Sequence, residues 1–417
     1  MMDKYVLDTP ENKEFLKEGA KNLLEFGRRF PSPEGGSYYL GDDGTPWKDR
    51  NRETWITCRM AHVYSMGAMM GVKGCKDLAK AAIKGLKGEL KDKVNGGWYA
   101  GLTCDNEVVP TKQCYAHAFV ILAASSALLA GVEGAEDLLS EALETYDKFF
   151  WNEEEGLSSD TWNTEFTKLD KYRGINANMH TVEAFLAAAD TFEALDKTNK
   201  EKALKYRERA GRIIDHVINW SKYNEYRIPE HFTEDWKPDL DKNKEKPDDP
   251  FKPYGATPGH GIEWARLIVQ WALSANPENR DYYVESACRL YNRAVKDGWN
   301  SDGAEGIVYT TDWSGKPVVR DRMHWTLAEA INTSAVLFRL TGQGKYKEDY
   351  SAFMRYLDNV VLDHTTGSWF HQLDENNELK GTVWPGKSDV YHAFQAMLIP
   401  YNKVEYSIAR AIYETNN

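Results

Sequence analysis

The sequence predicts an all-α protein: one (α/α)6-barrel domain over residues 1–417, with short β-hairpins at one end. Two observations predict this fold. A glycine, a short aromatic or β-branched run and an Asp/Asn-rich turn recur in that order along the chain, and two segments with helical spacing generally lie between successive copies. Six units of a hairpin and two helices would form an inner and an outer ring of helices.

The turn pattern repeats at a nearly constant interval. Gly36, Gly97 and Gly156 lie 61 and 59 residues apart, and Gly306 and Gly367 are again 61 residues apart. The interval of 150 residues between Gly156 and Gly306 contains a weaker copy of the pattern. A fixed period of this kind is typical of repeat architectures, in which each unit packs against its neighbours.

Helices are expected between these turns because apolar residues recur there at helical spacing. Phe119, Leu122 and Ala123, for example, share one face in the second interval. The expected helices cover residues 52–71, 76–90, 112–131, 136–150, 175–195, 200–220, 259–273, 281–296, 325–340, 345–361 and 390–414.

The last unit carries an unusual concentration of aromatic and basic residues. Residues 369–371 predict a short strand, and a return strand is expected to end at residues 384–386. A helix should follow behind Ser388 or Asp389 as its N-cap, with His392 in the first turn. Taken alone, His392 is interpreted more readily as a packing residue than as a catalytic one.

Residues 231–258 form the longest segment without a helical pattern, and they are rich in Pro, Lys and Asp. We interpret them as a surface loop, with a lid over the barrel mouth as one role for it. A domain linker is the alternative, but the repeat continues in phase beyond this segment.

Composition and charge narrow the classes of partner. The net charge of -12 and the pI of about 5.4 argue against a nucleic-acid or anionic-membrane partner. The longest apolar run, residues 118–132, is shorter than the ~20 residues of a membrane-spanning helix, so it predicts a buried helix. A homo-oligomer stays open.

The compartment is expected to be the cytoplasm. The N-terminus has neither a basic start nor an apolar segment, so no signal peptide is expected. The five cysteines include no C-x-x-C pair, which favours reduced thiols over a disulfide framework or a zinc site.

Candidate site residues lie in the early turns of the expected inner helices, which in such a barrel project into the central funnel. Spacings of i,i+4 and i,i+3 place Asn176 with His180, Trp325 with Glu329, and His260 with Glu263 on common helix faces. The residues that stand out in these turns are Arg59, His62, Tyr115, His117, Asn176, His180, His260, Glu263, Trp325, Glu329, His392 and Gln395.

Histidines beside carboxylates indicate acid–base chemistry, since a carboxylate fixes the imidazole tautomer and raises its basicity. A metal site gains no support, because the histidines come one per helix without H-E-x-x-H, and no cofactor is expected. A glycoside hydrolase could use Glu263 and Glu329, but the excess of histidines favours proton shuttling. His62 and His117 are interpreted as core or supporting residues, and His216 as structural.

Four motifs resemble the N-acylglucosamine 2-epimerase superfamily. They are RGINANMH at residues 173–180, PGHGIEW at 258–264, HWTLAE at 324–329 and WPGKSDVYH at 384–392, and the likeness extends to TCRM at 57–60. The resemblance covers nearly the full length and is nearest to the aldose–ketose isomerase branch of mannose and sulfoquinovose isomerases. It implies an (α/α)6 barrel and metal-independent proton transfer between C1 and C2 of a hexose through a cis-enediol(ate).

The resemblance also implies roles for particular residues. His260 and His392 match the paired acid/base histidines, and His180 matches the histidine associated with ring opening and sugar binding. Arg59 could in addition stabilise the enediolate oxygen. The positions that match sugar-contacting or supporting residues are Arg59, Tyr115, Asn176, Glu263, Trp325, Glu329 and Trp384.

The resemblance is weakest where a sulfonate would be held. Sulfosugar-using members have glutamines around the last hairpin, and those positions are His371 and Ser388 here. This difference favours a plain C6 hydroxyl, hence D-mannose and D-fructose or a related aldose such as lyxose. A sugar 2-epimerase, a sulfoquinovose isomerase and a non-catalytic sugar-binding barrel are the alternatives.

Overall fold

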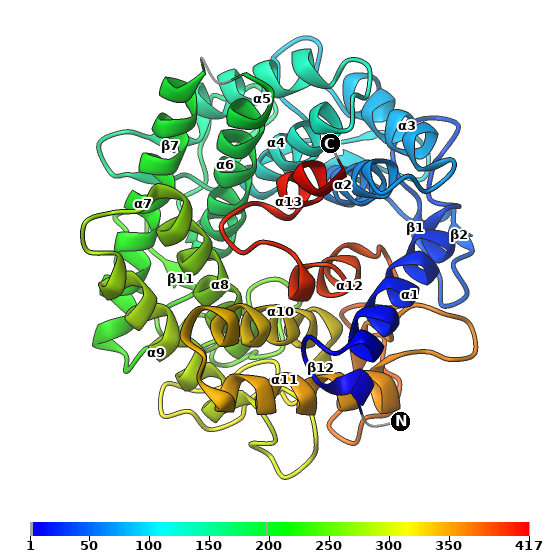
Figure 1. Cartoon of the computed structure of the whole chain (residues 1–417). Coiled ribbons are helices and arrows are strands. Elements are labelled where there is room, and N and C mark those ends of the chain that lie inside the picture. Colours follow the sequence, from blue (N-terminus) through cyan, green and yellow to red (C-terminus); the bar gives the residue numbers. More distant parts are fainter. Residues whose placement is uncertain (1–2, 197–198, 417) are drawn as a thin grey trace.

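The computed structural model describes residues 3–196 and 199–416, and it confirms the predicted fold class. Two concentric rings of helices surround a common axis (Figure 1). Neighbours in the inner ring are in contact all the way round, and each inner helix also contacts at least one outer helix. The inner helices are α2 (Thr54–Met69), α4 (Cys114–Leu129), α6 (Ile175–Leu195), α8 (Pro258–Ala275), α10 (His324–Thr341) and α12 (Tyr391–Ala396). The outer helices are α1 (Pro10–Gly27), α3 (Cys75–Lys87), α5 (Ala135–Phe149), α7 (Lys200–Tyr223), α9 (Arg280–Gly298) and α11 (Gly344–Tyr356).

Sequence composition explains which helices lie inside. Helix α4 is CYAHAFVILAASSALL, which is apolar on almost every face, and nearly all of it is buried. The outer helices, such as α7, carry charged residues on one face and apolar residues on the other. A helix that is apolar all round needs neighbours on every side, whereas an amphipathic helix covers the outside of the core.

Helix α1 is the outer helix that the repeat analysis missed. It precedes the first turn pattern, so no interval predicted it. Its start is nevertheless encoded locally: the Thr9 side chain accepts a hydrogen bond from the Asn12 backbone N–H, and Pro10 occupies the first helical position. Helix α1 packs beside α12 and so completes the outer ring.

The expected closing helix over residues 390–414 is wrong. Helix α12 ends at Ala396, a 3-10 turn covers Ile399–Tyr401, and α13 (Ile408–Asn416) follows. Pro400 supplies the physical reason, because it lacks the N–H and disfavours helical backbone at the residue before it. The expected helix over residues 345–361 is α-helical only as far as Tyr356, where α11 ends. Leu357–Val361 continue it as a π-turn.

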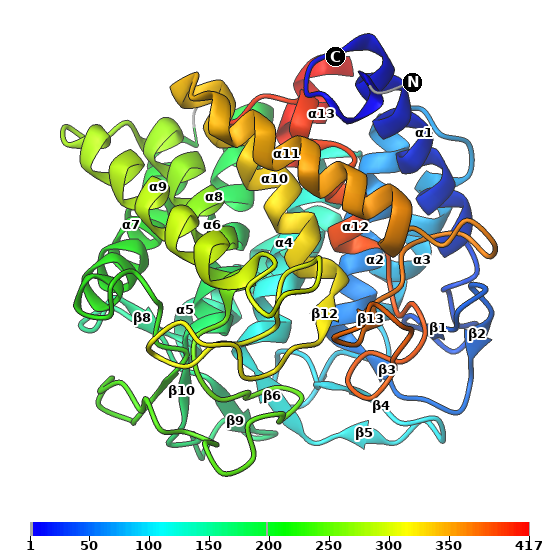
Figure 2. The same cartoon turned by 90° about the horizontal axis from the view of Figure 1, so that it is seen from below.

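The strands gather at one end of the barrel, as expected, whereas α13 and both termini lie at the other end (Figure 2). All paired strands are antiparallel, in the sets β1–β2, β3–β4–β5, β6–β9, β7–β8, β10–β11 and β12–β13. The strands are β1 (Tyr39–Leu40), β2 (Pro46–Trp47), β3 (Arg52–Glu53), β4 (Gly101–Leu102), β5 (Val108–Val109), β6 (Thr111–Gln113), β7 (Trp151–Asn152), β8 (Leu157–Ser158), β9 (Thr161–Asn163), β10 (Arg173–Gly174), β11 (His231–Phe232), β12 (Arg322–Met323) and β13 (Gln372–Leu373).

Four of these strands fix the entrances of inner helices. Strands β3, β6, β10 and β12 lead directly into α2, α4, α6 and α10, and each pairs with a strand of the following repeat. The expected strand at residues 369–371 is displaced, since β13 covers Gln372–Leu373 and Trp369 forms only an isolated bridge. The return strand expected to end at residues 384–386 is wrong, since the described residues 374–390 hold only an isolated bridge at Leu379. Pairing across repeats, rather than within a hairpin, therefore positions the helix N-termini that line the site.

Lys387, in the WPGKSDVYH motif, is bound within a turn of the last repeat. Its ammonium donates to Asp363 at 2.6 Å, to Thr366 at 2.9 Å and to the Gly367 carbonyl at 2.6 Å, and its side chain is fully buried. Lys112 makes the equivalent buried ion pair with Asp92 at 2.7 Å in an earlier repeat. We therefore regard Lys387 as part of a recurring structural element that ties a turn to the next helix entrance.

In the described part of the chain, no helix combines the length and the apolarity that a membrane crossing requires.

Candidate active site

The inner helices deliver their side chains to the barrel axis in layers. With 3.6 residues per turn, the second, sixth and ninth residues of a helix lie on one face. The second residues are Trp55, Tyr115, Asn176, Gly259 and Trp325, the sixth are Arg59, Phe119, His180, Glu263 and Glu329, and the ninth are His62, Leu122, Glu183, Arg266 and Asn332. His392 is the second residue of α12.

The layers differ in solvent access. The second residues form the upper layer, which lies nearest the strands. In this layer Trp55, Tyr115 and Asn176 are partly exposed, and so is His260 beside them. The sixth residues are all buried. Because the upper layer lies next to the strands, the site opens toward the strand end of the barrel.

His392 is held by a buried carboxylate. Its Nδ1–H donates to Glu329 Oε1 at 3.2 Å, and Glu329 Oε2 accepts from Arg266 Nε at 2.8 Å. Burial lowers the pKa of His392, although the Glu329 hydrogen bond opposes this effect. The imidazole is therefore neutral near pH 7, with its proton on Nδ1 and Nε2 available as a base.

His260 is held in the same way, but by a residue that the sequence did not reveal. Its Nδ1–H donates to Glu230 Oε2 at 2.9 Å, and its ring packs on Trp325 with centroids 5.0 Å apart. The expected pairing of His260 with Glu263 is wrong, because Glu263 faces the Arg266 guanidinium at 3.8 Å. The His392 ring lies 6.0 Å from that of Trp325, so the two imidazoles flank one indole.

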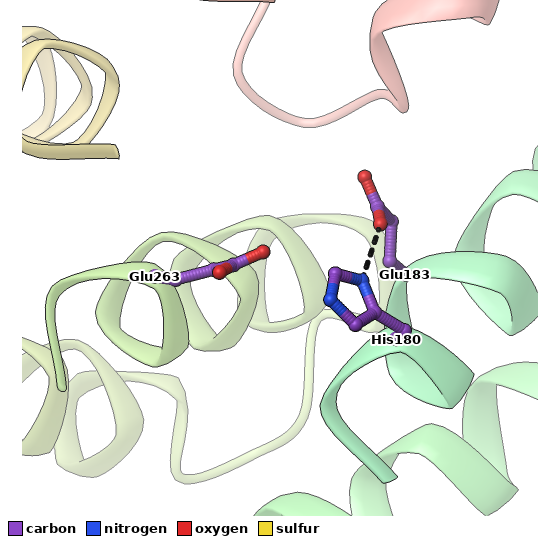
Figure 3. A group of neighbouring side chains, drawn as sticks. All are labelled: His180, Glu183 and Glu263. Atoms are coloured by element: carbon purple, nitrogen blue, oxygen red, sulfur yellow. Dashed lines mark hydrogen bonds and ion pairs between the residues drawn. The ribbon is translucent and has the colours of Figure 1, made fainter. Parts of the chain in front are cut away.

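A third imidazole–carboxylate pair comes from a single turn of α6 (Figure 3). His180 Nδ1 lies 3.2 Å from Glu183 Oε2, and the Tyr391 hydroxyl donates to Glu183 at 2.6 Å. Burial lowers the pKa of His180 to about 4, so this imidazole is neutral as well.

Three carboxyl groups and one guanidinium form the buried floor of the site; they belong to Glu183, Glu263, Glu329 and Arg266. Burial tends to raise the pKa of Glu329, but Arg266 and His392 lower it overall, so Glu329 is charged. For Glu263, burial and the nearby Glu329 charge raise the pKa well above its usual value. Glu263 Oε1 is buried without a hydrogen-bond partner among the described residues. The raised pKa favours the neutral carboxylic acid form of Glu263, which has a proton to donate.

His180, Glu183 and Glu263 also form the one group in the described residues whose ligand atoms converge within 4.8 Å of one another (Figure 3). A first-row metal ion needs each ligand atom at about 2.0–2.2 Å and deprotonated donors. Here the Glu183 carboxylate already accepts from Tyr391 and His180, and the raised pKa of Glu263 favours its protonated form, which is a poor metal ligand. These residues fit a hydrogen-bonded cluster better than an ion site.

Arg59 lies on the opposite wall from Arg266. Its Nη2 donates to the Tyr115 hydroxyl at 2.8 Å, and its Nη1 lies 3.4 Å from Asp389 Oδ2. The guanidinium also packs over the rings of Trp55 and Tyr391, each 4.7 Å away. Burial among aromatic rings leaves Arg59 a fixed positive charge in a site of low dielectric.

The remaining predicted residues lie at the last-repeat side of the site. Trp384 packs edge-on against Trp55 at 5.8 Å. His371 stacks on His324 with centroids 3.7 Å apart, and burial lowers the pKa of His371 well below its usual value. The Ser388 hydroxyl donates to Asp389 at 3.3 Å.

Several polar atoms around this site are buried without a partner in the described part of the chain. They include Asn176 Oδ1, Glu230 Oε1, Glu263 Oε1, Trp384 Nε1 and both ring nitrogens of His371. Buried polar atoms are nearly always hydrogen-bonded in folded proteins, so such a concentration indicates a site for a polar ligand.

A cavity lies beneath the buried floor of the site. Its volume is about 520 Å³, which includes the solvent space at its opening. His62, Glu183 and Arg266 line it from the ninth-residue layer, and Lys403 and Ser407 line it from the segment before α13. The cavity therefore lies on the side of this floor that faces the segment before α13.

Sequence reasoning identified Glu329, which supports His392, but it missed Glu183, Arg266 and Glu230. Arg266 and Glu183 could have been found, because each lies three residues after a candidate on the same helix. Glu230 lies outside any helix and 30 residues from His260, so no spacing rule pointed to it.

Comparisons with known proteins found similarity over nearly the full length of the chain. A model of the N-acylglucosamine 2-epimerase (GlcNAc 2-epimerase) family matches residues 35–396. A D-mannose isomerase of Pseudomonas cannabina pv. alisalensis is 39% identical over 411 residues, covering 97% of this chain and 96% of that protein. A D-mannose isomerase of Thermobifida fusca is 38% identical, over 96% of this chain and 97% of that protein.

Solved structures extend the likeness. A crystal structure of a D-mannose isomerase has a TM-score of 0.83 and 28% identity, covering 94% of this chain and 98% of that one. A cellobiose 2-epimerase from Spirochaeta thermophila DSM 6192 has a TM-score of 0.78 at 18% identity, covering 97% of both chains. At that identity the second match shows a common fold alone.

Proposed function

Because the chain belongs to the N-acylglucosamine 2-epimerase family, we propose that it is an aldose–ketose isomerase that interconverts D-mannose and D-fructose. The observation that carries the proposal is the pair of imidazoles that flank Trp325, each with Nδ1 bound to a carboxylate. In both, Nε2 is left for a proton of the substrate. Full-length identity to D-mannose isomerases supports this choice of substrate.

The reaction moves a proton from C2 of the aldose to C1 of the ketose through a cis-enediol(ate). In the proposal, His392 and His260 exchange protons with the carbon and oxygen atoms of this unit, as general acid–base catalysis requires. His180 assists ring opening, the role that the family resemblance implies for it, and its imidazole is held by Glu183 on α6. Arg59 stabilises the negative oxygen of the intermediate, because a fixed charge acts strongly in a water-poor site.

The other candidate residues hold the sugar. Tyr115 is oriented by Arg59, and Asn176 and Trp384 each offer a buried polar atom without a partner among the described residues. Trp325 supplies an apolar face for the sugar between the two histidines. In this proposal the main role of Glu329 is to support His392 through the hydrogen bond to its Nδ1.

Incubation of the protein with D-mannose in D2O, followed by NMR, tests the function. The proposal expects D-fructose and exchange at C2 of the remaining mannose. Glucose without fructose would instead identify a sugar 2-epimerase. If neither product nor exchange is detected, the result would identify a non-catalytic sugar-binding barrel and contradict the isomerase proposal.

The C6 end of the substrate is proposed to be a plain hydroxyl. His371 is kept neutral by burial, and the Lys387 ammonium is already bound to Asp363, so neither offers a free positive charge to a sulfonate. We therefore expect kcat/KM to be higher for D-mannose than for sulfoquinovose. Steady-state assays with both sugars check this, and a preference for sulfoquinovose would overturn the assignment of the substrate.

Glu263 should tolerate an uncharged replacement. Glutamine keeps the shape and a donor N–H, so Glu263→Gln should lower kcat/KM less than about tenfold, or about 1.4 kcal/mol. Glu263→Ala removes the donor and should cost about 10²-fold, the usual loss for one hydrogen-bond donor at a charged intermediate. Steady-state kinetics of the two variants make the comparison. Equal losses in both would show that Glu263 acts as a charged group.

The compartment and assembly belong to the proposal as well. All five cysteines are free, which supports a cytoplasmic location. The substrate is a monosaccharide, and a homo-oligomer is left open to measurement by light scattering.

A further inference from the structure

We propose that Glu230 is a positioning residue for the reaction: it holds the His260 imidazole in one tautomer, with Nε2 presented to the sugar. The inference rests on the proposed function insofar as His260 is one of the two acid/base groups. Glu230 does not touch the reacting atoms in this proposal. It acts through the 2.9 Å hydrogen bond from His260 Nδ1–H to its Oε2.

The backbone around Glu230 is fixed independently of His260. The Glu230 carbonyl accepts from the Ile175 N–H at 3.1 Å, at the first residue of α6. The next residue, His231, pairs with Gly174 in β10–β11, and its ring contacts the Pro253 carbonyl at 2.8 Å. Glu230 is thus held at the entrance of α6 while its side chain reaches across to His260 on α8.

The environment of Glu230 makes the imidazole its main partner. Glu230 is 5% exposed, and in the described part of the chain its Oε1 has no hydrogen-bond partner. A buried carboxylate that loses its hydrogen bond is strongly destabilised. Rotation of the His260 ring would leave the carboxylate in this state, so the ring is held with Nδ1 toward Glu230.

Glu329 provides the internal comparison. It binds His392 Nδ1 but also shares its charge with the Arg266 guanidinium at 2.8 Å. For Glu230, no ion pair with a lysine or arginine is found in the described residues. The orientation of His260 therefore depends on one carboxylate, with no second group to replace it.

The test compares Glu230→Gln with Glu234→Gln. Glu234 lies four residues later, is exposed and pairs with Lys171, so its replacement removes the same charge without touching His260. Glu230→Gln should lower kcat about 10–100-fold with little change in KM, by analogy with the loss of the hydrogen-bond partner of a metal-bound histidine. Glu234→Gln should retain wild-type kcat, and Glu230→Asp should recover part of the loss.

A direct readout separates positioning from folding. The ¹⁵N chemical shifts of the His260 ring, assigned with His260→Gln, should report a proton on Nδ1 in the wild type and a mixed tautomer in Glu230→Gln. Far-UV circular dichroism and thermal unfolding identify a variant that fails to fold, in which case Glu230→Asp serves for the comparison. An unchanged ring spectrum, or a kcat equal to that of Glu234→Gln, would overturn the proposal.

The same spectrum distinguishes this inference from the proposed function. If the wild-type protein does not isomerise mannose, the function proposal fails, while the tautomer of His260 still tests its bond to Glu230. If isomerisation occurs but the tautomer does not respond to Glu230→Gln, the positioning role alone fails.

Discussion

Replacing His392 by asparagine should lower kcat for mannose isomerisation by about 10³-fold, within the range for loss of a general acid–base group. Asparagine retains a short side chain with an N–H that can donate to Glu329, so the buried carboxylate keeps a partner. What it loses is the basic nitrogen Nε2. The fold should survive, and thermal unfolding should show a transition near that of the wild type.

The matched control for this variant is His216→Asn. His216 lies on the outer helix α7 and bonds the Glu155 carbonyl at 2.9 Å, far in the fold from the inner layers. Its replacement should leave kcat unchanged. Wild-type turnover by His392→Asn would remove this residue from the mechanism.

Replacing Arg266 by methionine should destabilise the fold by about 3–5 kcal/mol, the usual cost of leaving a buried charge without its partner. Arg266 donates to Glu329 at 2.8 Å and faces Glu263 at 3.8 Å, and both carboxyl groups are buried. Methionine fills a similar volume but supplies no charge. Urea unfolding at pH 7, with the slope compared to the wild type, measures the loss.

The sign of the pH dependence follows from Glu329. Its folded-state pKa is lowered overall by Arg266 and His392 against the effect of burial, so its ion pair stabilises the fold above the unfolded-state pKa of about 4.3. That contribution is lost as the pH falls toward the folded-state pKa. The difference in stability between the wild type and Arg266→Met should therefore shrink at acid pH.

A second substitution checks the cause of this loss. Glu329→Gln in the Arg266→Met background removes the uncompensated charge, so it should recover part of the lost stability. Loss of stability that is simply additive in the double variant would show that Arg266 and Glu329 do not act as a pair.

The period of the turns was sufficient to predict the two rings of helices, because each repeat carries its own glycine and apolar pattern. It could not predict α1, which stands before the first turn, or the break at Pro400, where one proline outweighs an otherwise helical pattern. Strand pairing could not be predicted from the sequence either. Strands β10 and β12 pair with β11 and β13, which belong to the next repeat and lie at least about 50 residues further along the chain.

Part of the site was predictable because the repeat places candidate residues at equivalent positions. His180, Glu263 and Glu329 occupy the same position on successive inner helices, so spacing alone placed them together. Which carboxylate binds His392 or His260 was not predictable, since Glu329 is 63 residues from His392 and Glu230 is 30 residues from His260. Such pairs depend on the closure of the ring, which no local pattern encodes.

The central claim is that this barrel moves a proton from C2 of mannose to C1 of fructose, and isotopic labelling tests it most directly. D-[2-²H]mannose should react more slowly than unlabelled mannose, and fructose formed from unlabelled mannose in D2O should carry solvent deuterium at C1. Equal rates for the two sugars, together with fructose free of solvent deuterium at C1, would contradict the claim.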